Sequence, residues 1–384
     1  MDFDNLCEME GEVFLQKITF IINSLSSGGA EKVLSVIVAE LIKQNYQVEI
    51  IFLEQNEFYK LDKRIKNIYL SNFNGSESGL KKLLYIPLLA YRLKKYIQKN
   101  DIKLIQSHIF RANYVNVLAK LFGATHKAQV VTAGRVSRYK ELGLNGKINL
   151  WLIKTLYAKA DLIISKAQGM QEDMQKLFNY NVPQIVINNP YDIKLIETLS
   201  QEKVEFEFKK EKRYLILVGR LIKLKRNHEM IEVLKKLNED VELIFLGDGS
   251  EKENLQSLVK NYSLESRVHF LGQVSNPYKY ISKSDIFVSC SESEGFPNVL
   301  VESMICKTVV VSSDCVSGPK EILGDNECGL LFDVGNKEKL LEHIGFLLEN
   351  ENDRKIFIEK ARKRAEDFSI ESIIKKYKEV LEVE

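Results

Sequence analysis

The chain is poor in the residues that mark several classes of protein. Its 384 residues include five cysteines, none of them in a Cys-x-x-Cys pair, so neither a disulfide framework nor a zinc site is indicated. Six prolines and 20 glycines are too few for a fibrous or low-complexity chain. No apolar run approaches the ~20 residues that a membrane-spanning helix needs. We therefore expect a compact protein of the reducing cytoplasm, not integral to a membrane.

The N-terminal residues lack the features of a secretory signal. Met1-Asp2-Phe3-Asp4 is followed by Glu8, Glu10 and Glu12, and no basic segment precedes an apolar one. We interpret residues 1–16 as an N-terminal extension. Asp2-Phe3-Asp4 is the single Asp-x-Asp sequence, and we attribute it to chance in this tail. With no His/Cys cluster elsewhere, we expect neither a metal ion nor another cofactor.

Positive charge is concentrated in the first half of the chain. The formal net charge is +2, yet residues 51–150 contain 18 Lys/Arg against 6 Asp/Glu. Such a block suits an anionic membrane surface, an acidic acceptor or nucleic acid, but no zinc-finger, RNP or basic-zipper pattern supports nucleic acid. Between Lys81 and Tyr96, cations alternate with apolar and aromatic residues, as on an interfacial helix. An ordinary amphipathic helix with a solvated basic face explains that pattern equally well.

Short apolar runs alternate with helical patterns along the chain, which is the rhythm of open parallel sheets. We expect one doubly wound domain over residues 17–192 and a second over 213–367, joined by a charged, structureless linker at 193–212. The final helix is expected over residues 368–384. In such sheets a ligand lies beyond the carboxyl ends of the strands, and here also in the cleft between domains. The predicted strands are 18–23, 48–53, 103–107, 129–132, 162–165, 214–218, 241–246, 268–271, 286–289 and 308–312.

The most informative segment runs from Ser291 to Ser303. Glu294 follows a predicted strand, Gly295 permits close approach of the backbone to a ligand, and a helix begins near Asn298. Its N-terminus presents N–H groups suited to a diphosphate, and Glu302 lies where it can accept hydrogen bonds from a ribose. A capped helix with a solvated glutamate is the plain structural alternative.

A second segment places cations after a strand. Gly219 permits a sharp turn after Val218, and Arg220 and Lys225 follow within six residues. Fixed cations of this kind stabilise a departing nucleoside diphosphate without a metal. Lys223 and Arg226 are expected to face solvent.

Further candidates lie in the N-terminal half of the chain. Gly28 and Gly29 stand between a strand and a helix, where a glycine pair can cradle an anion or simply form a turn. The segment is not G-x-G-x-x-G, which argues against a nicotinamide enzyme. His108 ends a central strand, and a lone histidine there is as readily structural as functional. Arg111 and Arg135 are weaker candidates for phosphate or acceptor contacts.

These motifs resemble those of glycosyltransferase family 4, whose E-x7-E element is met by Glu294 and Glu302 and whose GR-x4-K element is met by Arg220 and Lys225. The resemblance covers nearly the whole chain from about residue 17. It implies the retaining GT-B fold, two Rossmann-like domains that close around donor and acceptor, with the last helix returning to the N-terminal domain.

The resemblance also assigns roles. Glu294 and His108 would orient the donor sugar, Glu302 would bind the ribose, and Arg220 and Lys225 would stabilise the leaving group. Gly28 and Gly29 would lie under the sugar and diphosphate. The other donor-binding positions implied are Gly219, Gln273, Val274, Gly295, Phe296, Pro297, Asn298, Val299 and Leu300.

The expected reaction moves a hexose or N-acetylhexosamine from a nucleotide sugar. Segments 276–280 and 317–321 resemble those of family members that use uridine-diphosphate sugars, which favours uridine diphosphate as the carrier. The acceptor would be a glycan or a lipid-linked glycan of bacterial surface-polysaccharide assembly. The protein would be cytoplasmic, with peripheral contact to the inner face of the membrane. Two rivals remain, a nucleotide-sugar epimerase of similar architecture and a non-catalytic partner subunit. Neither is expected to retain Glu294, Arg220 and Lys225 together.

Overall fold

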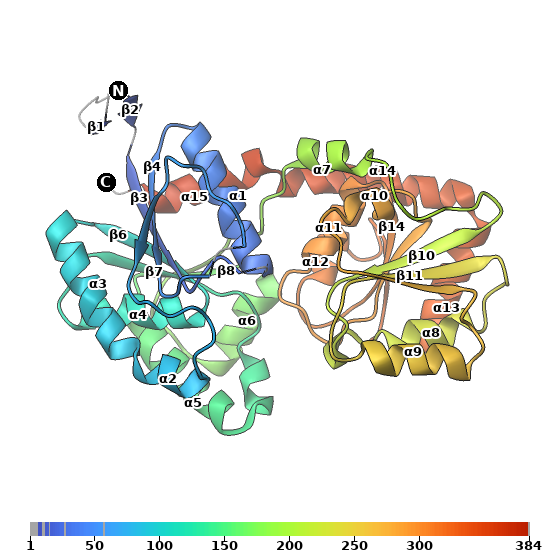
Figure 1. Cartoon of the computed structure of the whole chain (residues 1–384), viewed down its shortest axis with the longest axis horizontal. Coiled ribbons are helices and arrows are strands. Elements are labelled where there is room, and N and C mark those ends of the chain that lie inside the picture. Colours follow the sequence, from blue (N-terminus) through green and yellow to red (C-terminus); the bar gives the residue numbers. More distant parts are fainter. Residues whose placement is uncertain (1–6, 10–11, 15, 27, 57, 383–384) are drawn as a thin grey trace. The chain divides into compact units, whose positions relative to one another are not determined.

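The computed structural model describes residues 7–9, 12–14, 16–26, 28–56 and 58–382. Within it the chain forms two compact units. The first comprises residues 1–190 together with 370–384, and the second comprises residues 191–369. Both are parallel sheets covered by helices on either face (Figure 1), so the predicted pair of doubly wound α/β domains is confirmed.

The sheet of the first unit has seven strands in the order β5-β4-β3-β6-β7-β8-β9, all parallel. Its central strands are buried on both faces and are rich in Ile, Val and Phe, as parallel strands between helices must be. The strands are β3 Lys17–Ile22, β4 Gln47–Phe52, β5 Lys66–Tyr69, β6 Leu104–His108, β7 Lys127–Val131, β8 Leu162–Ser165 and β9 Gln184–Val186.

Helices cover this sheet in two layers, each with its own core. Apolar side chains of α3, α4 and α5 pack on one face, and those of α1 and α15 pack on the other. The helices are α1 Gly29–Lys43, α2 Gly79–Leu84, α3 Ile86–Asn100, α4 Phe110–Leu121, α5 Gly143–Leu156, α6 Gln168–Leu177 and α15 Ile370–Leu381, with 3-10 turns η1 Ser137–Glu141 and η2 Tyr157–Lys159.

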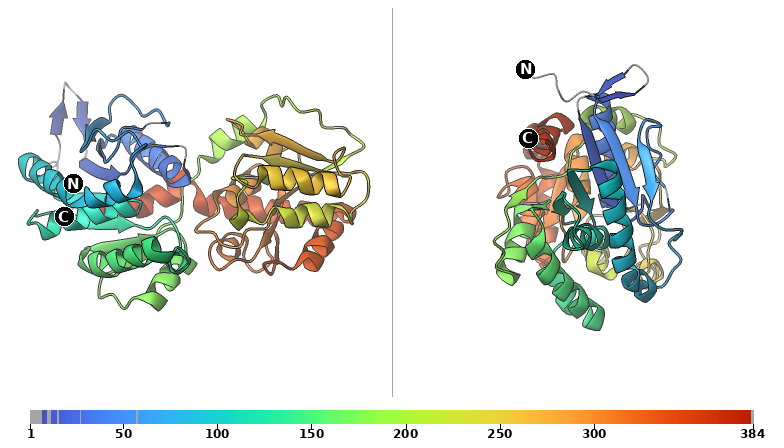
Figure 2. Two further views of the ribbon diagram at one scale, coloured as in Figure 1. Left: turned by 60° about the horizontal axis from the view of Figure 1, so that its bottom comes forward. Right: turned by 90° about the vertical axis from the view of Figure 1, so that its left-hand side faces the viewer.

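The last helix, α15, belongs to the first unit although it follows the second in sequence. Ile373, Ile374 and Tyr377 are fully buried in the core shared with α1. Their spacing places them on one helical face, which explains why a helix with so many charged residues still docks. The expected return of the final helix to the N-terminal domain is thus observed (Figure 2).

The second unit has a six-stranded parallel sheet in the order β12-β11-β10-β13-β14-β15. Its strands are β10 Arg213–Val218, β11 Val241–Leu246, β12 Val268–Gly272, β13 Ile286–Ser289, β14 Val309–Ser313 and β15 Leu330–Phe332. One face packs against α8, α9 and α13, while α7, α10, α11 and α14 lie over the other (Figure 1).

The helices of this unit are mostly short. They are α7 Ile193–Ser200, α8 His228–Leu234, α9 Lys252–Asn261, α10 Tyr278–Ile281, α11 Asn298–Ile305, α12 Pro319–Leu323, α13 Lys337–Glu349 and α14 Glu351–Ala365, with 3-10 turns η3 Lys223–Lys225 and η4 Glu366–Phe368.

The interpretation of residues 193–212 as a structureless linker is wrong. Residues 193–200 form α7, whose N-cap Asp192 accepts a hydrogen bond from the Leu195 amide. The side chains of Glu202 and Glu205 bind Asn276 and Lys279 of the same unit. The charges that suggested a linker therefore fix this segment to the second unit, and the change of unit falls earlier, at residues 190–191.

Several smaller elements were missed. The edge strands β5, β9 and β15, three or four residues long, were not among the predicted strands. Within the N-terminal extension, β1 Cys7–Met9 pairs with β2 Glu12–Phe14. The Asp2-Phe3-Asp4 sequence lies outside the described residues.

The basic segment at 81–96 is not one helix. The break falls at Tyr85, between α2 and α3. Pro87 stands in the first turn of α3, a position that suits proline at a helix start. Among the helices that the structure describes, none is both long and apolar enough to span a bilayer.

Candidate active site

The second unit has a crevice at the carboxyl ends of β10 and β13. These strands are neighbours, but the chain continues from them toward opposite edges of the sheet. Loops that leave adjacent strands in opposite directions open a crevice at this point. A pocket lies there, lined by residues 217–221, Lys225, Asn227, residues 287–291 and Val299.

Glycines bring the loops beyond β10 and β11 into backbone contact. Gly219 has φ +142 and Gly247 has φ +137, a conformation that other residues adopt only with strain. A Cβ on Gly247 would lie 2.0 Å from the Gly219 carbonyl oxygen, and one on Gly249 would lie 2.3 Å from the Leu221 carbonyl oxygen. The glycines after β11 therefore fix the course of the loop that carries Arg220.

Lys225 and Glu294 meet although they are far apart in sequence. The Lys225 Nζ lies 2.5 Å from Glu294 Oε1, and both side chains are partly exposed. The Glu292 amide donates to the Leu224 carbonyl oxygen at 2.9 Å, which holds the two loops side by side. Arg220 is exposed and, like Lys225, lines the pocket. The GR-x4-K segment and Glu294 therefore converge at one edge of the second unit's sheet.

Lys223 and Arg226 differ from each other. Lys223 is exposed, as expected. The Arg226 guanidinium instead pairs with the buried Glu229 carboxylate, and Arg226 itself is in the left-handed region at φ 48. Arg226 therefore closes the turn before α8 and is not a simple solvated cation.

Helix α11 begins where it was expected, directly after Pro297. The Tyr191 hydroxyl donates to Asn298 Oδ1 at 2.7 Å, and the Phe296 ring packs edge-on against Phe368. Glu302 is 6% exposed and accepts a long hydrogen bond from the Tyr278 hydroxyl at 3.4 Å. Leu300 is buried, while Val299 reaches the pocket.

The loop from Glu294 to Pro297 is held by the segment that begins at Ser317. Ser317 Oγ donates to the Gly295 carbonyl oxygen at 2.8 Å. Gly318 has φ +95, and a Cβ there would lie 2.3 Å from Pro297 Cδ. The loop after β14 thus sets the position of the glutamate loop after β13.

Gln273 and Val274 follow β12, at the same edge of the sheet. Gln273 is exposed and Val274 is half-buried. Gly272 has φ +72 and its carbonyl oxygen accepts from the Gly247 amide at 2.7 Å. Neither Gln273 nor Val274 lines the pocket between β10 and β13.

In the first unit the strand order reverses between β3 and β6, and His108 ends β6 opposite Ile22. The imidazole is 2% exposed, and its Nε2 lies 3.0 Å from Gln106 Oε1. Burial, reinforced by the nearby Lys166 cation, holds the pKa of His108 well below its usual value. A neutral ring that donates from Nε2 to the amide oxygen has Nδ1 left as an acceptor.

A chain of side-chain amides connects His108 to the last helix. Gln106 Nε2 donates to Gln129 Oε1 at 2.9 Å, and Gln129 Nε2 donates to the Val380 carbonyl oxygen at 2.5 Å. Lys166, which follows β8, donates to the Tyr377 hydroxyl of α15. Burial lowers the pKa of Lys166 to about 7. The polar interior of the first unit is thus closed by α15.

Gly28 and Gly29 stand where the chain passes from β3 into α1, with Gly28 as the N-cap. Ser26 Oγ donates to Glu31 Oε1 at 2.9 Å. A Cβ on Gly28 would lie 2.1 Å from Glu31 Oε2, so the Glu31 carboxylate fills the space that a larger residue at this turn would need. Gly29 is exposed at the start of the helix.

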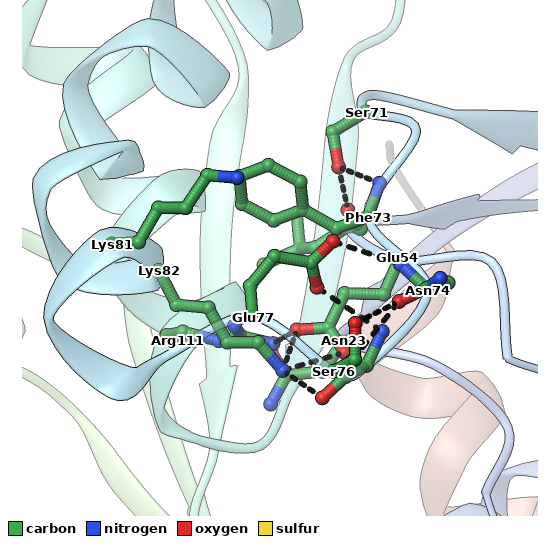
Figure 3. Close-up of polar contacts among 12 residues, drawn as sticks. Asn23, Glu54, Ser71, Phe73, Asn74, Ser76, Glu77, Lys81, Lys82 and Arg111 are labelled. Carbon is green, nitrogen blue, oxygen red and sulfur yellow. Dashed lines mark hydrogen bonds and ion pairs between the residues drawn. The ribbon is translucent and has the colours of Figure 1, made fainter.

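Arg111 and Arg135 both have acidic partners. Arg111 and Lys82 converge on Glu54, whose carboxylate is 4% exposed, while Lys81 lies over the Phe73 ring (Figure 3). The Lys82 Nζ is 3.1 Å from Glu54 Oε1. The Arg135 Nε lies 3.6 Å from Asp173 Oδ1. These ion pairs tie α2, α4 and α6 to the loops at the sheet edge.

Sequence reasoning missed the contacts that support the site, namely those of Tyr191 with Asn298, Tyr278 with Glu302, Ser317 with Gly295, Gly318 with Pro297 and Gly247 with Gly219. The Gly247-Asp248-Gly249 turn had a signal, a glycine pair after a predicted strand, while segments 276–280 and 317–321 had indicated only the class of donor. Over the residues that the structure describes, no group of three His, Cys, Asp or Glu side chains is arranged to hold a metal ion. Burial raises the pKa of the Cys290 thiol at the pocket wall, which disfavours a thiolate there.

Two parallel α/β units, one with a cationic pocket at its switch point, define the class of GT-B glycosyltransferases. Residues 27–195 match the model of Glycosyltransferase Family 4, and residues 200–364 match that of the glycosyl transferases group 1. The chain belongs to this family, and it is a glycosyltransferase.

Relatives and solved structures agree with this assignment. The N-acetylgalactosamine-N,N'-diacetylbacillosaminyl-diphospho-undecaprenol 4-alpha-N-acetylgalactosaminyltransferase of Campylobacter jejuni is 33% identical over 92% of this chain and 96% of its own. A sucrose-phosphate synthase from Thermosynechococcus elongatus has TM-score 0.80 at 18% identity, covering 95% of this chain and 98% of that one. The Anabaena protein HepE in complex with UDP has TM-score 0.75 at 20% identity, covering 95% and 99%. Both structures show likeness of fold alone.

Proposed function

We propose that the protein moves a hexose or N-acetylhexosamine from a UDP-sugar to a hydroxyl of a lipid-linked glycan, with retention of configuration and without a metal ion. The observation that carries the proposal is the meeting of Lys225 with Glu294 beside Arg220 at the switch-point pocket. Two cations and one carboxylate at this edge are the groups that a sugar diphosphate requires: positive charge for the diphosphate and an acceptor for sugar hydroxyls.

The cations act on the leaving group. When the bond between the sugar and the diphosphate breaks, negative charge grows on the departing phosphate oxygen. Arg220 and Lys225 donate charge-assisted hydrogen bonds to that oxygen and its neighbours. In the structure Lys225 is held by Glu294. A bound diphosphate would take over Lys225 and leave Glu294 to accept hydrogen bonds from the sugar.

The rest of the donor would lie along the same edge. The amides of residues 296–300, at and before the start of α11, suit the phosphates. The Glu302 carboxylate suits the ribose hydroxyls, and the backbone of Gln273 and Val274 suits the base. Gly28 and Gly29 are proposed for the sugar and diphosphate. His108 is proposed to accept a hydrogen bond from the sugar through Nδ1, since Nε2 is already committed to Gln106.

Retention follows from attack on the face that the leaving group vacates. The acceptor hydroxyl oxygen forms a bond to the anomeric carbon while the bond from that carbon to the phosphate oxygen breaks. The hydroxyl proton passes to that phosphate oxygen, so no protein base is required. Arg111 and Arg135 are proposed for the acceptor, with Arg111 exchanging its Glu54 partner for an acceptor phosphate.

Uridine and a lipid-linked acceptor are proposed from the comparisons. HepE was solved with UDP, and the Campylobacter jejuni relative is named for a diphospho-undecaprenol-linked acceptor. Bacterial surface-glycan assembly at the inner face of the cell membrane is the setting that fits both, with the protein cytoplasmic and peripheral.

The donor is tested by thermal unfolding in the presence of chelator with a panel of nucleoside diphosphates and nucleotide sugars. At a hundredfold excess over Kd a ligand stabilises the fold by ~2.7 kcal/mol. We expect a uridine-diphosphate shift that fades in Arg220→Ala and persists in Lys223→Ala, an exposed neighbour. No shift with any nucleotide would contradict the donor site and favour a non-catalytic partner subunit.

Contact with an anionic membrane is proposed for α2 and α3. From Gly79 to Asn100 the chain has six Lys/Arg and no acidic residue, which suits anionic lipid. Flotation with vesicles, with and without phosphatidylglycerol, tests the point on wild type and on charge reversal of Lys81, Lys82, Lys94 and Lys95. Equal flotation of both proteins would contradict it.

A further inference from the structure

Helix α5 has an exposed face that nothing in the transfer reaction uses. Leu144, Lys147, Trp151 and Lys154 recur at intervals of three or four residues, so they share one side of the helix. Leu144 is 74% exposed and Trp151, the chain's single tryptophan, is 62% exposed. The opposite side, through Ile153 and Leu156, is buried in the core shared with α3 and α4.

Other helices on the same face of the sheet also expose apolar side chains. Sixteen large apolar side chains are exposed among the described residues, and nine of them lie on α2 and α3 and at or beside the exposed parts of α4 and α5. They are Leu80, Leu84, Leu88, Tyr91, Leu121, Phe122, Leu142, Leu144 and Trp151. In the described part of the chain, α1 and α15 on the other sheet face contribute none. Figure 1 shows α2 and α5 at the same, lower end of the first unit. More than half of the exposed large apolar side chains of the described residues thus belong to α2, α3, α4 and α5 or lie beside them.

The charge of this surface is of one sign. Helices α2, α3 and α5 contain eight Lys/Arg and no Asp or Glu. In a symmetric dimer through α5, the lysines of each copy would face those of the other, which is repulsive. An anionic lipid surface satisfies both features, because leucine and tryptophan enter the interfacial layer while the lysine stems extend their ammonium groups to phosphates.

We propose that the face of α5 formed by Leu144, Lys147, Trp151 and Lys154 inserts into the interfacial layer of an anionic membrane, as a second contact beside α2 and α3. The proposal rests on the proposed function, since a lipid-linked acceptor places the enzyme at the membrane. It adds an orientation: contact through α2, α3 and α5 together fixes which side of the first unit faces the lipid.

Trp151 makes the test specific, because it is the chain's single tryptophan and all tryptophan fluorescence therefore comes from this position. The full chain is titrated with vesicles of phosphatidylcholine containing about one-third phosphatidylglycerol, with and without bromine on the acyl chains. We expect a blue shift of the emission and quenching by brominated lipid, both absent with pure phosphatidylcholine. Lys147→Gln/Lys154→Gln keeps the reporter and should weaken partitioning roughly 25-fold, since each lysine near an anionic surface contributes ~1 kcal/mol, a factor of about five.

The matched control is Lys375→Gln/Lys376→Gln, two exposed lysines on α15 at the opposite sheet face, which should partition like wild type. Flotation without blue shift or quenching would overturn the proposal, because the membrane contact would then lie elsewhere. A blue shift that grows with protein concentration in the absence of vesicles would overturn it in favour of self-association. The UDP-induced thermal shift is measured on the same samples without lipid, so loss of the donor site is recognised separately from loss of membrane contact.

Discussion

The two units share a topology and differ in what they place at the switch point. In the second unit, Arg220, Lys225 and Glu294 are exposed or partly exposed around an open pocket. In the first, Gln106, His108 and Lys166 are buried beneath α15 and joined by hydrogen bonds to that helix or to one another. Both units thus have a switch point at the carboxyl ends of their strands. In the second unit its side chains are accessible and charged, whereas in the first they are buried and held by hydrogen bonds.

The largest effect is expected at the charged edge. Replacing Lys225 by alanine removes a cation from the site where, in our proposal, leaving-group charge develops. Loss of one such donor typically lowers the rate 10²- to 10³-fold, about 2.7–4 kcal/mol. The turnover number for UDP release should fall by that factor. Lys223→Ala, on the same 3-10 turn but exposed, should leave it within twofold, and an equal fall in both variants would remove Lys225 from the mechanism.

The backbone of the charged edge is expected to tolerate change poorly. Gly247→Ala puts a Cβ 2.0 Å from the Gly219 carbonyl oxygen at φ +137, so the loop carrying Arg220 must shift. Strain of this kind costs about 1–3 kcal/mol, and UDP affinity should fall together with stability.

Gly345→Ala is the control for that change. Gly345 lies within α13 with open space around its Cβ position, and alanine should stabilise the helix by about 0.5–1 kcal/mol. Thermal unfolding with and without UDP compares the two variants. Unchanged UDP affinity in Gly247→Ala would show that the glycine contact does not shape the pocket.

The buried edge is expected to respond to pH. The Lys166 pKa is about 7 in the folded chain and 10.5 ordinarily, so unfolding takes up a proton between these values. Stability should therefore rise with pH from about 7 to 10.5, with a slope of at most about 1.4 kcal/mol per unit. Lys166→Met should flatten the slope measured by urea unfolding. Lys375→Met, at an exposed position of α15, should keep it, and a slope unchanged by Lys166→Met would contradict this assignment.

The smallest effect is expected where α15 closes the first unit. Ile373 is fully buried there, and Ile373→Val removes one methylene at a cost of about 0.5–1.5 kcal/mol. Amide exchange of β3 should speed up accordingly. Ile356→Val, half-exposed on α14 of the second unit, should leave β3 unchanged. Slowed or equal exchange in Ile373→Val would mean that α15 adds little to this core.

Most of the fold was predictable, since Ile/Val-rich runs separated by helical patterns have few other solutions. The order of the motifs placed Arg220, Lys225 and Glu294 at one sheet edge because parallel strands bring their carboxyl ends together. Residues 193–212 were misinterpreted as a linker because the local sequence shows only their charge. Their partners, Asn276 for Glu202 and Lys279 for Glu205, lie about 74 residues further on. The hydrogen bond from Ser317 to Gly295 could not be predicted for the same reason, since it joins two loops and leaves no local sequence pattern.

The account depends most directly on the claim that the switch-point cations of the second unit bind a diphosphate. Calorimetric titration of UDP, UMP and uridine in the presence of chelator tests it, on wild type, Arg220→Ala/Lys225→Ala and Lys223→Ala. We predict that affinity rises from uridine to UMP to UDP, that the double variant loses the gain from the phosphates while still binding uridine, and that Lys223→Ala matches wild type. Equal affinity for uridine and UDP in wild type, or an unweakened double variant, would contradict the account.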